Sequence, residues 1–226
     1  MPTLCICGID TGIGKSLVTG LLARHLMGQG SRVITQKLVQ TGCNGRSTDI
    51  LIHRRLMETG WLEVDEEQLT CPYCFPFAAS PHLAARLAGR AIDPARITAA
   101  TRRLEARFEW TLLEGAGGLL VPLTEELTLL DYLADQDVPV ILVTSPRLGS
   151  INHTLMSLEM LRTRRMKLAG LVYNLFGQDQ KAIVMDSRQV FARALREYGF
   201  QASIVDLPIW PQGGRAEWPG VLAFFR

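Results

Sequence analysis

The segment GIDTGIGKS, residues 8–16, has the residue types of a loop that binds phosphate. It fits the phosphate-loop pattern, in which glycines bracket a few residues and are followed by lysine and a hydroxyl residue. Glycine lets the backbone curl so that its N–H groups point inward at phosphate oxygens. Lys15 would place a positive charge near the β- and γ-phosphates, and the Ser16 hydroxyl would be a ligand for Mg²⁺. A glycine-rich structural turn is the alternative, which the strand pattern before the loop and the helix pattern after it disfavour.

Two further charged residues stand at the ends of apolar runs. Lys37 follows the run Arg32–Gln36, and Glu114 follows the residues WTLL and precedes GAGG. Because the carboxyl ends of parallel strands meet at one edge of a sheet, we expect both side chains beside the phosphate loop. A second lysine there suits phosphoryl transfer, in which catalysis consists largely of positioning and charge neutralisation. Glu114 would be a second Mg²⁺ ligand, whereas Lys37 taken alone could equally be a solvated surface lysine.

Asp49 is a third acidic candidate for the metal site. It lies at the start of a predicted helix, where it could complete the Mg²⁺ shell. An acidic residue is also favourable at a helix start without any ligand, because it complements the helix dipole. On the residues alone, Glu114 is therefore the stronger candidate.

Short apolar runs alternate with longer amphipathic segments, which is typical of strands joined by crossover helices in a parallel sheet. The pattern predicts strands at Thr3–Cys7, Arg32–Gln36, Trp110–Glu114, Val138–Thr144, Leu168–Asn174 and Ser203–Leu207. It predicts helices at Gly14–Met27, Thr48–Met57, Pro81–Leu87, Pro94–Ala106, Leu127–Ala134, Ser150–Arg164 and Lys181–Tyr198. We expect a three-layer α/β fold, with a mainly parallel sheet covered by helices on both faces, formed by residues 1–226 as a single domain. The segment Trp61–Phe77 is predicted to be an irregular excursion.

The composition excludes several classes of partner. The chain has 226 residues, 24 Lys and Arg against 22 Asp and Glu, a net charge of +2, 47% hydrophobic residues and a mean hydropathy of +0.13. A charge so close to zero disfavours nucleic acid or an anionic membrane as the main partner. The N-terminus lacks the features of a signal peptide, and no apolar run approaches the roughly 20 residues that span a bilayer. We therefore expect a cytoplasmic protein.

The cysteines and histidines are interpreted as structural. Five cysteines without an export signal favour reduced thiols. Cys71 and Cys74 in CPYC suggest a metal or redox site, but structural zinc needs four convergent ligands, and we do not adopt that interpretation. A lone histidine is seldom a ligand, so His25, His53 and His82 are interpreted as structural as well.

Five segments together resemble the dethiobiotin synthetase family: GIDTGIGKS at 8–16, KLVQTG at 37–42, SPH at 80–82, EGAGGLLVPL at 114–123 and LGSINH at 148–153. Their order and spacing match as well, and the resemblance runs from Leu4 to about Pro208. That family closes 7,8-diaminononanoate with CO2 or bicarbonate to dethiobiotin, ADP and phosphate in biotin biosynthesis. The resemblance implies a carbamate intermediate, a carbamic-phosphoric anhydride, ATP as co-substrate and Mg²⁺ as cofactor.

The resemblance also implies a role for each matching residue. The catalytic residues would be Lys37 and Lys15. The Mg²⁺ ligands would be Ser16, Asp49 and Glu114. The nucleotide would contact Gly12, Ile13, Gly14, Lys15, Ser16, Leu17, Asp49, Glu114, Gly115, Ala116, Gly117, Asn174, Pro208 and Ile209. The substrate would contact Thr11, Lys37, Thr41, Gly149, Ser150, Ile151 and Asn152.

Members of the family are homodimers, in which the segment matching 149–153 holds the substrate carboxylate across the interface. The residues agree, because Ser150 is a good helix N-cap and a helix N-terminus favours anions. The chain departs from the family at Asn174-Leu175, where an Asn-Asp pair commonly contacts adenine. This departure favours the hypothesis of looser nucleotide selectivity.

Two rival functions belong to the same nucleotide-binding superfamily. A nucleotide-switched partitioning or positioning ATPase carries an extra lysine five residues before the invariant lysine, and Asp10 stands there in this chain. A cobyrinate-amidase-like synthetase would normally carry an amidotransferase domain with a nucleophilic cysteine motif, for which we find no match. The sequence therefore favours a dethiobiotin-synthetase-like enzyme.

Overall fold

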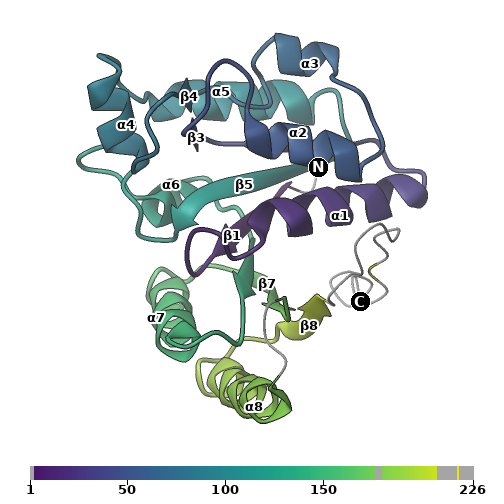
Figure 1. The fold of residues 1–226 in the computed structure, drawn as a ribbon, viewed down its shortest axis with the longest axis vertical. Coiled ribbons are helices and arrows are strands. Elements are labelled where there is room, and N and C mark those ends of the chain that lie inside the picture. The colour runs from purple at the N-terminus through teal and green to yellow at the C-terminus, as the bar shows by residue number, and fades with distance from the viewer. Residues whose placement is uncertain (1–2, 177–179, 208–217, 219–226) are drawn as a thin grey trace.

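A parallel six-stranded sheet forms the middle layer of the fold (Figure 1). The computed structural model describes residues 3–176, 180–207 and 218. The strand order is β2-β5-β1-β6-β7-β8, and every neighbouring pair is parallel. The strands are β1 (Thr3–Gly8), β2 (Val33–Lys37), β5 (Trp110–Gly118), β6 (Val140–Thr144), β7 (Leu168–Asn174) and β8 (Ser203–Leu207). The four inner strands are almost continuously apolar because helices cover both of their faces.

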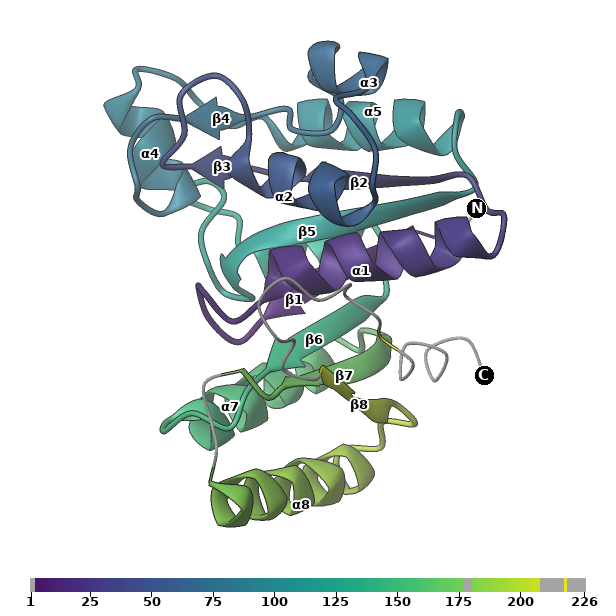
Figure 2. The same ribbon diagram turned by 45° about the vertical axis from the view of Figure 1, so that its right-hand side comes forward.

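The helices divide between the two faces of the sheet. The connection from β1 to β2 runs in the opposite direction to those that lead to β5, β6, β7 and β8, so right-handed crossovers place its helix on the opposite face. Figure 2 shows α1 with α2 beside it in front of β5 and β1. The helices are α1 (Lys15–Gly28), α2 (Thr48–Leu56), α3 (Glu63–Glu66), α4 (Pro81–Leu87), α5 (Pro94–Glu105), α6 (Leu129–Asp135), α7 (Ser150–Thr163) and α8 (Lys181–Glu197). This confirms the predicted parallel sheet with helices on both faces.

The predicted strands and helices are all present, and three have the predicted bounds: α4, β7 and β8. Two other elements differ from the prediction. Strand β5 continues four residues beyond Glu114 to Gly118, because Gly118 still pairs with Gly8 of β1 after an irregularity in the register that includes Gly117 at φ +65°. The segment Trp61–Phe77 is not wholly irregular, since it contains α3 and the short strand β4 (Cys74–Phe75), which pairs with β3 (Gln40–Thr41).

A buried ion pair fixes this segment against helix α2. The Arg54 guanidinium donates to both carboxylate oxygens of Asp65, at 2.9 and 2.6 Å, and both side chains are almost fully buried. The backbone N–H of Lys37 then donates to the Thr70 carbonyl at 2.8 Å. The segment therefore holds the end of β2 in place, and with it the backbone of Lys37.

The expectation of reduced thiols is wrong for one pair of cysteines. Cys43 and Cys74 form a disulfide with their Cα atoms 6.4 Å apart, because the β3–β4 pairing brings the two chain segments together. Cys5 and Cys7 are buried free thiols in β1, and Cys71 is a half-buried free thiol. The disulfide joins the segment just after β3, which contains Cys43, to the first residue of β4, Cys74.

None of the helices in the described parts of the chain is long and apolar enough to cross a membrane.

Candidate functional site

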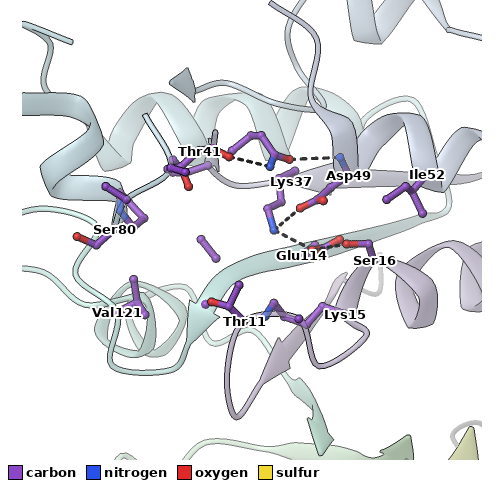
Figure 3. A pocket seen from close by; sticks show the side chains of 18 of the residues that line it. Thr11, Lys15, Ser16, Lys37, Thr41, Asp49, Ile52, Ser80, Glu114 and Val121 are labelled. Carbon is purple, nitrogen blue, oxygen red and sulfur yellow. Dashed lines mark hydrogen bonds and ion pairs between the residues drawn. The ribbon is translucent and has the colours of Figure 1, made fainter. Parts of the chain in front are cut away.

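The candidate charges meet at the carboxyl edge of β1, β2 and β5. In the β2–β5 register Lys37 lies opposite Glu114, and in the β1–β5 register Glu114 lies opposite Ile6. The phosphate loop leaves β1 at this edge and leads into α1. Figure 3 shows the side chains of Lys15, Ser16, Lys37 and Glu114 converging there. Residues that are up to a hundred positions apart in the sequence thus share one site.

These residues line a cavity of about 750 Å³. Twelve of the predicted site residues are among its lining residues: Thr11, Gly12, Gly14, Lys15, Ser16, Leu17, Lys37, Thr41, Asp49, Glu114, Ala116 and Gly117. A volume of this size is typical of small-molecule sites. The loop, the ends of β2 and β5, and the start of α2 therefore form one concave site, as the sequence predicts.

Lys37 lies at the centre of the polar contacts (Figure 3). Its ammonium is 2.7 Å from Asp49 Oδ2 and 2.8 Å from Glu114 Oε1, and it donates to the Gly115 carbonyl at 2.9 Å. The side chain is 6% exposed, so it is not the solvated surface lysine that the residue alone would have allowed. The lysine thus pairs with both carboxylates that the sequence proposes as metal ligands.

The electrostatics of this pair depend on burial and on opposite charge. Burial acts to raise the pKa of Glu114, but the Lys37 charge and the hydrogen bond from His53 outweigh it and hold that pKa well below its usual range. Burial acts to lower the pKa of Lys37, and the Glu114 and Asp49 carboxylates outweigh it and raise that pKa. Both groups are therefore charged near neutral pH.

Lys15 is in a different electrostatic environment. Burial and the nearby charge of Lys37 lower the pKa of Lys15 to about 8, against the raising effect of the carboxylates. Its ammonium donates to the Asp10 carbonyl at 2.7 Å, within the loop itself. A neutral oxygen compensates a buried charge less well than a carboxylate does. A phosphate that binds here would therefore stabilise the charged form of Lys15 more than that of Lys37.

Helix α2 supplies two groups from one face. Ser47 is its N-cap and accepts from the Ile50 N–H, and the Gln40 amide oxygen accepts from Ser47 Oγ at 2.9 Å. These bonds fix the first turn, which carries Asp49. One turn later, His53 Nε2 lies 2.7 Å from Glu114 Oε2, and the ring is fully buried. His53 is interpreted as structural from the sequence, and the structure places its ring against Glu114.

The phosphate loop is supported by Asn174 at the end of β7. Its amide donates to the Ile13 carbonyl at 2.8 Å, and a Cβ on Gly14 would lie only 2.5 Å from Asn174 Nδ2. Gly14 also has φ +103°, which glycine alone adopts readily. Glycine is thus required at position 14. Ile13 points into the core rather than the cavity, and Leu175 is half-buried.

The predicted substrate segment at the start of α7 lies away from the cavity of its own chain. Gly149, with φ +88°, is the N-cap, and Ser150 is the first helical residue, so the prediction of Ser150 as N-cap is wrong. Ser150 is buried and its hydroxyl lies 3.2 Å from that of Ser145. Ile151 and Asn152 are exposed. Within the described residues, the segment 149–152 does not line the cavity, and the predicted contacts Pro208 and Ile209 lie outside the described residues.

The donor set suits a hard divalent cation. Ser16 Oγ lies 3.0 Å from Glu114 Oε1, and Asp49 supplies a carboxylate oxygen on the other side of Lys37. Hydroxyl and carboxylate oxygens are the ligands that Mg²⁺ prefers. The Lys37 ammonium lies between the two carboxylates and pairs with both, as a metal ion would. Ser16, Asp49 and Glu114 therefore have the oxygen donors that a Mg²⁺ site requires.

Sequence reasoning missed part of the cavity wall. Val39, Gln40, Ile52, Ala78, Ala79, Ser80, Pro81 and Val121 also line it. Five of these had a signal, because they belong to the KLVQTG, SPH and EGAGGLLVPL segments of the resemblance: Val39, Gln40, Ser80, Pro81 and Val121. Ile52, Ala78 and Ala79 had none. The signal for His53 was its spacing of four residues from Asp49 on a predicted helix, which places both on one face.

Comparisons with known proteins agree on one family. A family model described as an AAA domain matches residues 2–199. The chain is 51% identical over 205 residues to the ATP-dependent dethiobiotin synthetase BioD of Chlorobaculum tepidum, covering 90% of this chain and 86% of the relative. It is 47% identical over 193 residues to BioD 2 of Pasteurella multocida, covering 85% and 91%.

Solved structures are similar at the level of the fold. The septum site-determining protein MinD of Pyrococcus horikoshii, solved with Mg-ADP, has a TM-score of 0.56 at 18% identity and covers 98% of this chain and 93% of its own. Cobyrinic acid a,c-diamide synthase of Mycobacterium smegmatis has a TM-score of 0.50 at 15% identity, with 99% and 91% covered. Proteins with the two rival functions thus have a similar fold, but their sequence identities to this chain are too low to indicate a shared function.

Proposed function

The chain belongs to the family of ATP-dependent dethiobiotin synthetases and is an ATP-dependent ligase of biotin biosynthesis, and we propose that it closes 7,8-diaminononanoate with CO2 at the cavity described above. One observation supports this location: Lys15, Ser16, Lys37, Asp49 and Glu114 converge on one cavity at the carboxyl edge of the sheet. ATP is the co-substrate. We propose that the protein works in the cytoplasm, where ATP and bicarbonate are available.

The proposed reaction has three steps. One amine of the substrate attacks CO2 and loses a proton, which gives a carbamate. A carbamate oxygen attacks the γ-phosphorus of ATP while the bond to the bridging oxygen breaks, which gives a carbamic-phosphoric anhydride and ADP. The second amine attacks the carbamoyl carbon, the phosphate leaves, and loss of the amine proton completes the cyclic urea.

The chain's own residues would act by neutralising and positioning charge. Lys15, at the first turn of α1, would contact the β- and γ-phosphates together with the loop N–H groups. Lys37, at the carboxyl end of β2, would balance the carbamate and the transferring phosphoryl oxygens. Thr11 and Thr41 line the cavity and would contact the substrate.

A divalent cation fits this assignment. We propose that Ser16, Asp49 and Glu114 hold Mg²⁺, which when bound would neutralise phosphate charge and orient the γ-phosphoryl group. The residues around it keep their stated tasks: Lys37 balances the substrate side, and Lys15 the nucleotide side.

We further propose that the active form is a homodimer. The segment 149–152 does not line the cavity among the described residues of its own chain, and four large apolar side chains on this part of the chain are exposed: Leu120, Leu148, Ile151 and Met156, by 48%, 103%, 36% and 56%. An apolar patch of this kind is expected at a protein interface. The start of α7 in one copy would then bind the substrate carboxylate at the cavity of the other.

Product formation from labelled bicarbonate tests the proposed reaction. Purified protein would be incubated with 7,8-diaminononanoate, ATP, Mg²⁺ and ¹³C-bicarbonate, and the product analysed by mass spectrometry. We expect dethiobiotin with the label in its urea carbon, and one ADP per product. Absence of product from protein that binds ADP would contradict the proposal.

Ile151→Glu tests the dimer, with Ile183→Glu on the exposed face of α8 as a matched control. Light scattering should show a dimer for the control and a monomer for Ile151→Glu, whose KM for diaminononanoate should rise. A dimer with unchanged KM in Ile151→Glu would argue against an interface at α7.

A further inference from the structure

His53 contacts a proposed metal ligand from outside the cavity. The ring lies on α2, is fully buried, and places Nε2 2.7 Å from Glu114 Oε2. It is not among the residues that line the cavity. It therefore lies outside the lining of the cavity, yet it is bonded to Glu114, which belongs to that lining.

The two oxygens of Glu114 have different partners. Oε1 faces the cavity, where Lys37 Nζ lies at 2.8 Å and Ser16 Oγ at 3.0 Å. Oε2 is bonded to His53. The carboxylate of an ion pair is an acceptor only, so His53 must donate its Nε2–H. Within the described residues His53 Nδ1 has no hydrogen-bond partner, so the bond from Nε2 to Glu114 is the one hydrogen bond that holds the ring there.

These separate partners fix the rotation of the Glu114 carboxylate. The carboxylate of a glutamate can rotate about its Cγ–Cδ bond, and either oxygen could then face the cavity. The donor at Oε2 makes one orientation favourable, in which Oε1 is directed at Ser16 and Lys37. The other side-chain contacts of Glu114 come from Lys37 and Ser16, which line the cavity and which the proposed function assigns to substrate, phosphate and cation. His53 does not line the cavity, so its bond to Glu114 does not compete with those tasks.

We propose that His53 is a positioning residue, which orients Glu114 so that one carboxylate oxygen is presented to a divalent cation bound with the nucleotide. The inference rests on the proposed assignment of Glu114 as a metal ligand. Partners that orient metal ligands in this way typically change metal affinity or activity by about 10- to 100-fold when they are removed.

Three substitutions separate the hydrogen bond from the packing. His53→Leu removes the donor and keeps an apolar side chain of similar bulk. His53→Gln places an amide N–H near the position of Nε2 and should restore the bond. His53→Asn carries the same amide on a shorter side chain, near the position of Nδ1, and should not reach Glu114. Arg54→Met is a control for damage to α2, since Arg54 pairs with Asp65 and does not contact Glu114.

Cation binding is measured directly with Mn²⁺ as the probe. Mn²⁺ would be titrated into each protein with saturating ADP, and the free ion followed by electron paramagnetic resonance. We expect the Kd for Mn²⁺ to rise about 10-fold or more in His53→Leu and His53→Asn and to remain within about 3-fold of wild type in His53→Gln. Affinity for ADP in EDTA should be unchanged, and high Mg²⁺ should recover the turnover of His53→Leu.

The outcomes distinguish this inference from the proposed function. A wild-type Kd for Mn²⁺ in His53→Leu would overturn the positioning role, even if the enzyme makes dethiobiotin. Equal losses in His53→Gln, His53→Leu and Arg54→Met would also overturn it, because they would indicate packing alone. A wild type without dethiobiotin activity, whose Mn²⁺ binding nevertheless weakens in His53→Leu, would contradict the proposed function and support this inference.

Discussion

Replacement of Lys37 by methionine should destabilise the ligand-free protein strongly. Lys37 is 6% exposed and is the shared cation of Glu114, which is 1% exposed, and Asp49, which is 19% exposed. Methionine keeps most of the volume and removes the charge, so both carboxylates lose their counter-ion. Removing one partner of a buried ion pair costs about 3–5 kcal/mol, because the other charge stays buried. For a chain of this size this lowers the Tm by about 6–20 °C.

The measurement is thermal unfolding with and without ligand. Lys181→Met, at an exposed position on α8, is the matched control and should change stability by less than about 0.5 kcal/mol. Mg²⁺ with ADP should raise the Tm of Lys37→Met by more than it raises that of wild type, since the divalent cation replaces the missing charge between the carboxylates. Turnover should fall by about 10²- to 10³-fold, because an electrostatic contact to the transition state is lost.

A double-mutant cycle decides whether the carboxylates cause the loss. Glu114→Gln in the Lys37→Met background removes the uncompensated charge and should recover part of the stability, which gives a coupling of opposite sign to the single losses. A Tm within about 2 °C of wild type for Lys37→Met would refute the reasoning, as would simple additivity in the double variant.

Three further predictions follow from the contacts around the site. Since burial lowers the pKa of Lys15 to about 8 and bound phosphate favours its charged form, ADP binding at pH 9 should take up about 0.9 proton and clearly less at pH 7.5; calorimetry in two buffers of different ionisation heat measures this, and no uptake at pH 9 would contradict it. Asn174→Ala loses the bond to the Ile13 carbonyl, so stability should fall by about 1 kcal/mol and ADP affinity should fall with it; an unchanged ADP titration would count against a supporting role for Asn174. Arg54→Met should cost about 3–5 kcal/mol in urea unfolding, and Asp65→Leu in the same chain should restore part of it.

The strands could be predicted because each is a short, almost continuously apolar run. Buried parallel strands have this pattern, and the helices between them have a different period. The position of Lys37 and Glu114 followed from the same reasoning, since both stand where an apolar run ends. The two-residue strands β3 and β4 could not be predicted, because a pair of residues has no period and because their pairing, of Gln40 with Cys74 and of Thr41 with Phe75, joins segments far apart in the sequence.

The contacts that support the site depend on the tertiary structure. Asn174 reaches the phosphate loop across 161 positions, at the end of a strand that is not adjacent to β1. The resemblance named Asn174 as a nucleotide contact, and the structure uses its amide to hold the Ile13 carbonyl. His53 had only its spacing from Asp49 as a signal. That spacing predicts a shared helix face, and only the packing of α2 against β5 identifies Glu114 as its partner.

The charged groups of the site compensate one another, although each would be costly to bury alone. Lys37 pairs with Glu114 and Asp49, and Lys15 donates to a backbone carbonyl. The two lysines and the two carboxylates together have a net charge of zero. A nucleotide adds several negative charges to this balanced set, and the two carboxylates oppose it. We propose that a divalent cation bound with the nucleotide would remove that opposition, because Glu114 and Asp49 would be its ligands and both lysines would be left for the phosphate and carbamate oxygens. The overall charge of +2 therefore says little about the ligand, whereas the three buried charges and the half-buried Asp49 at one edge of the sheet favour a nucleotide that arrives with its metal.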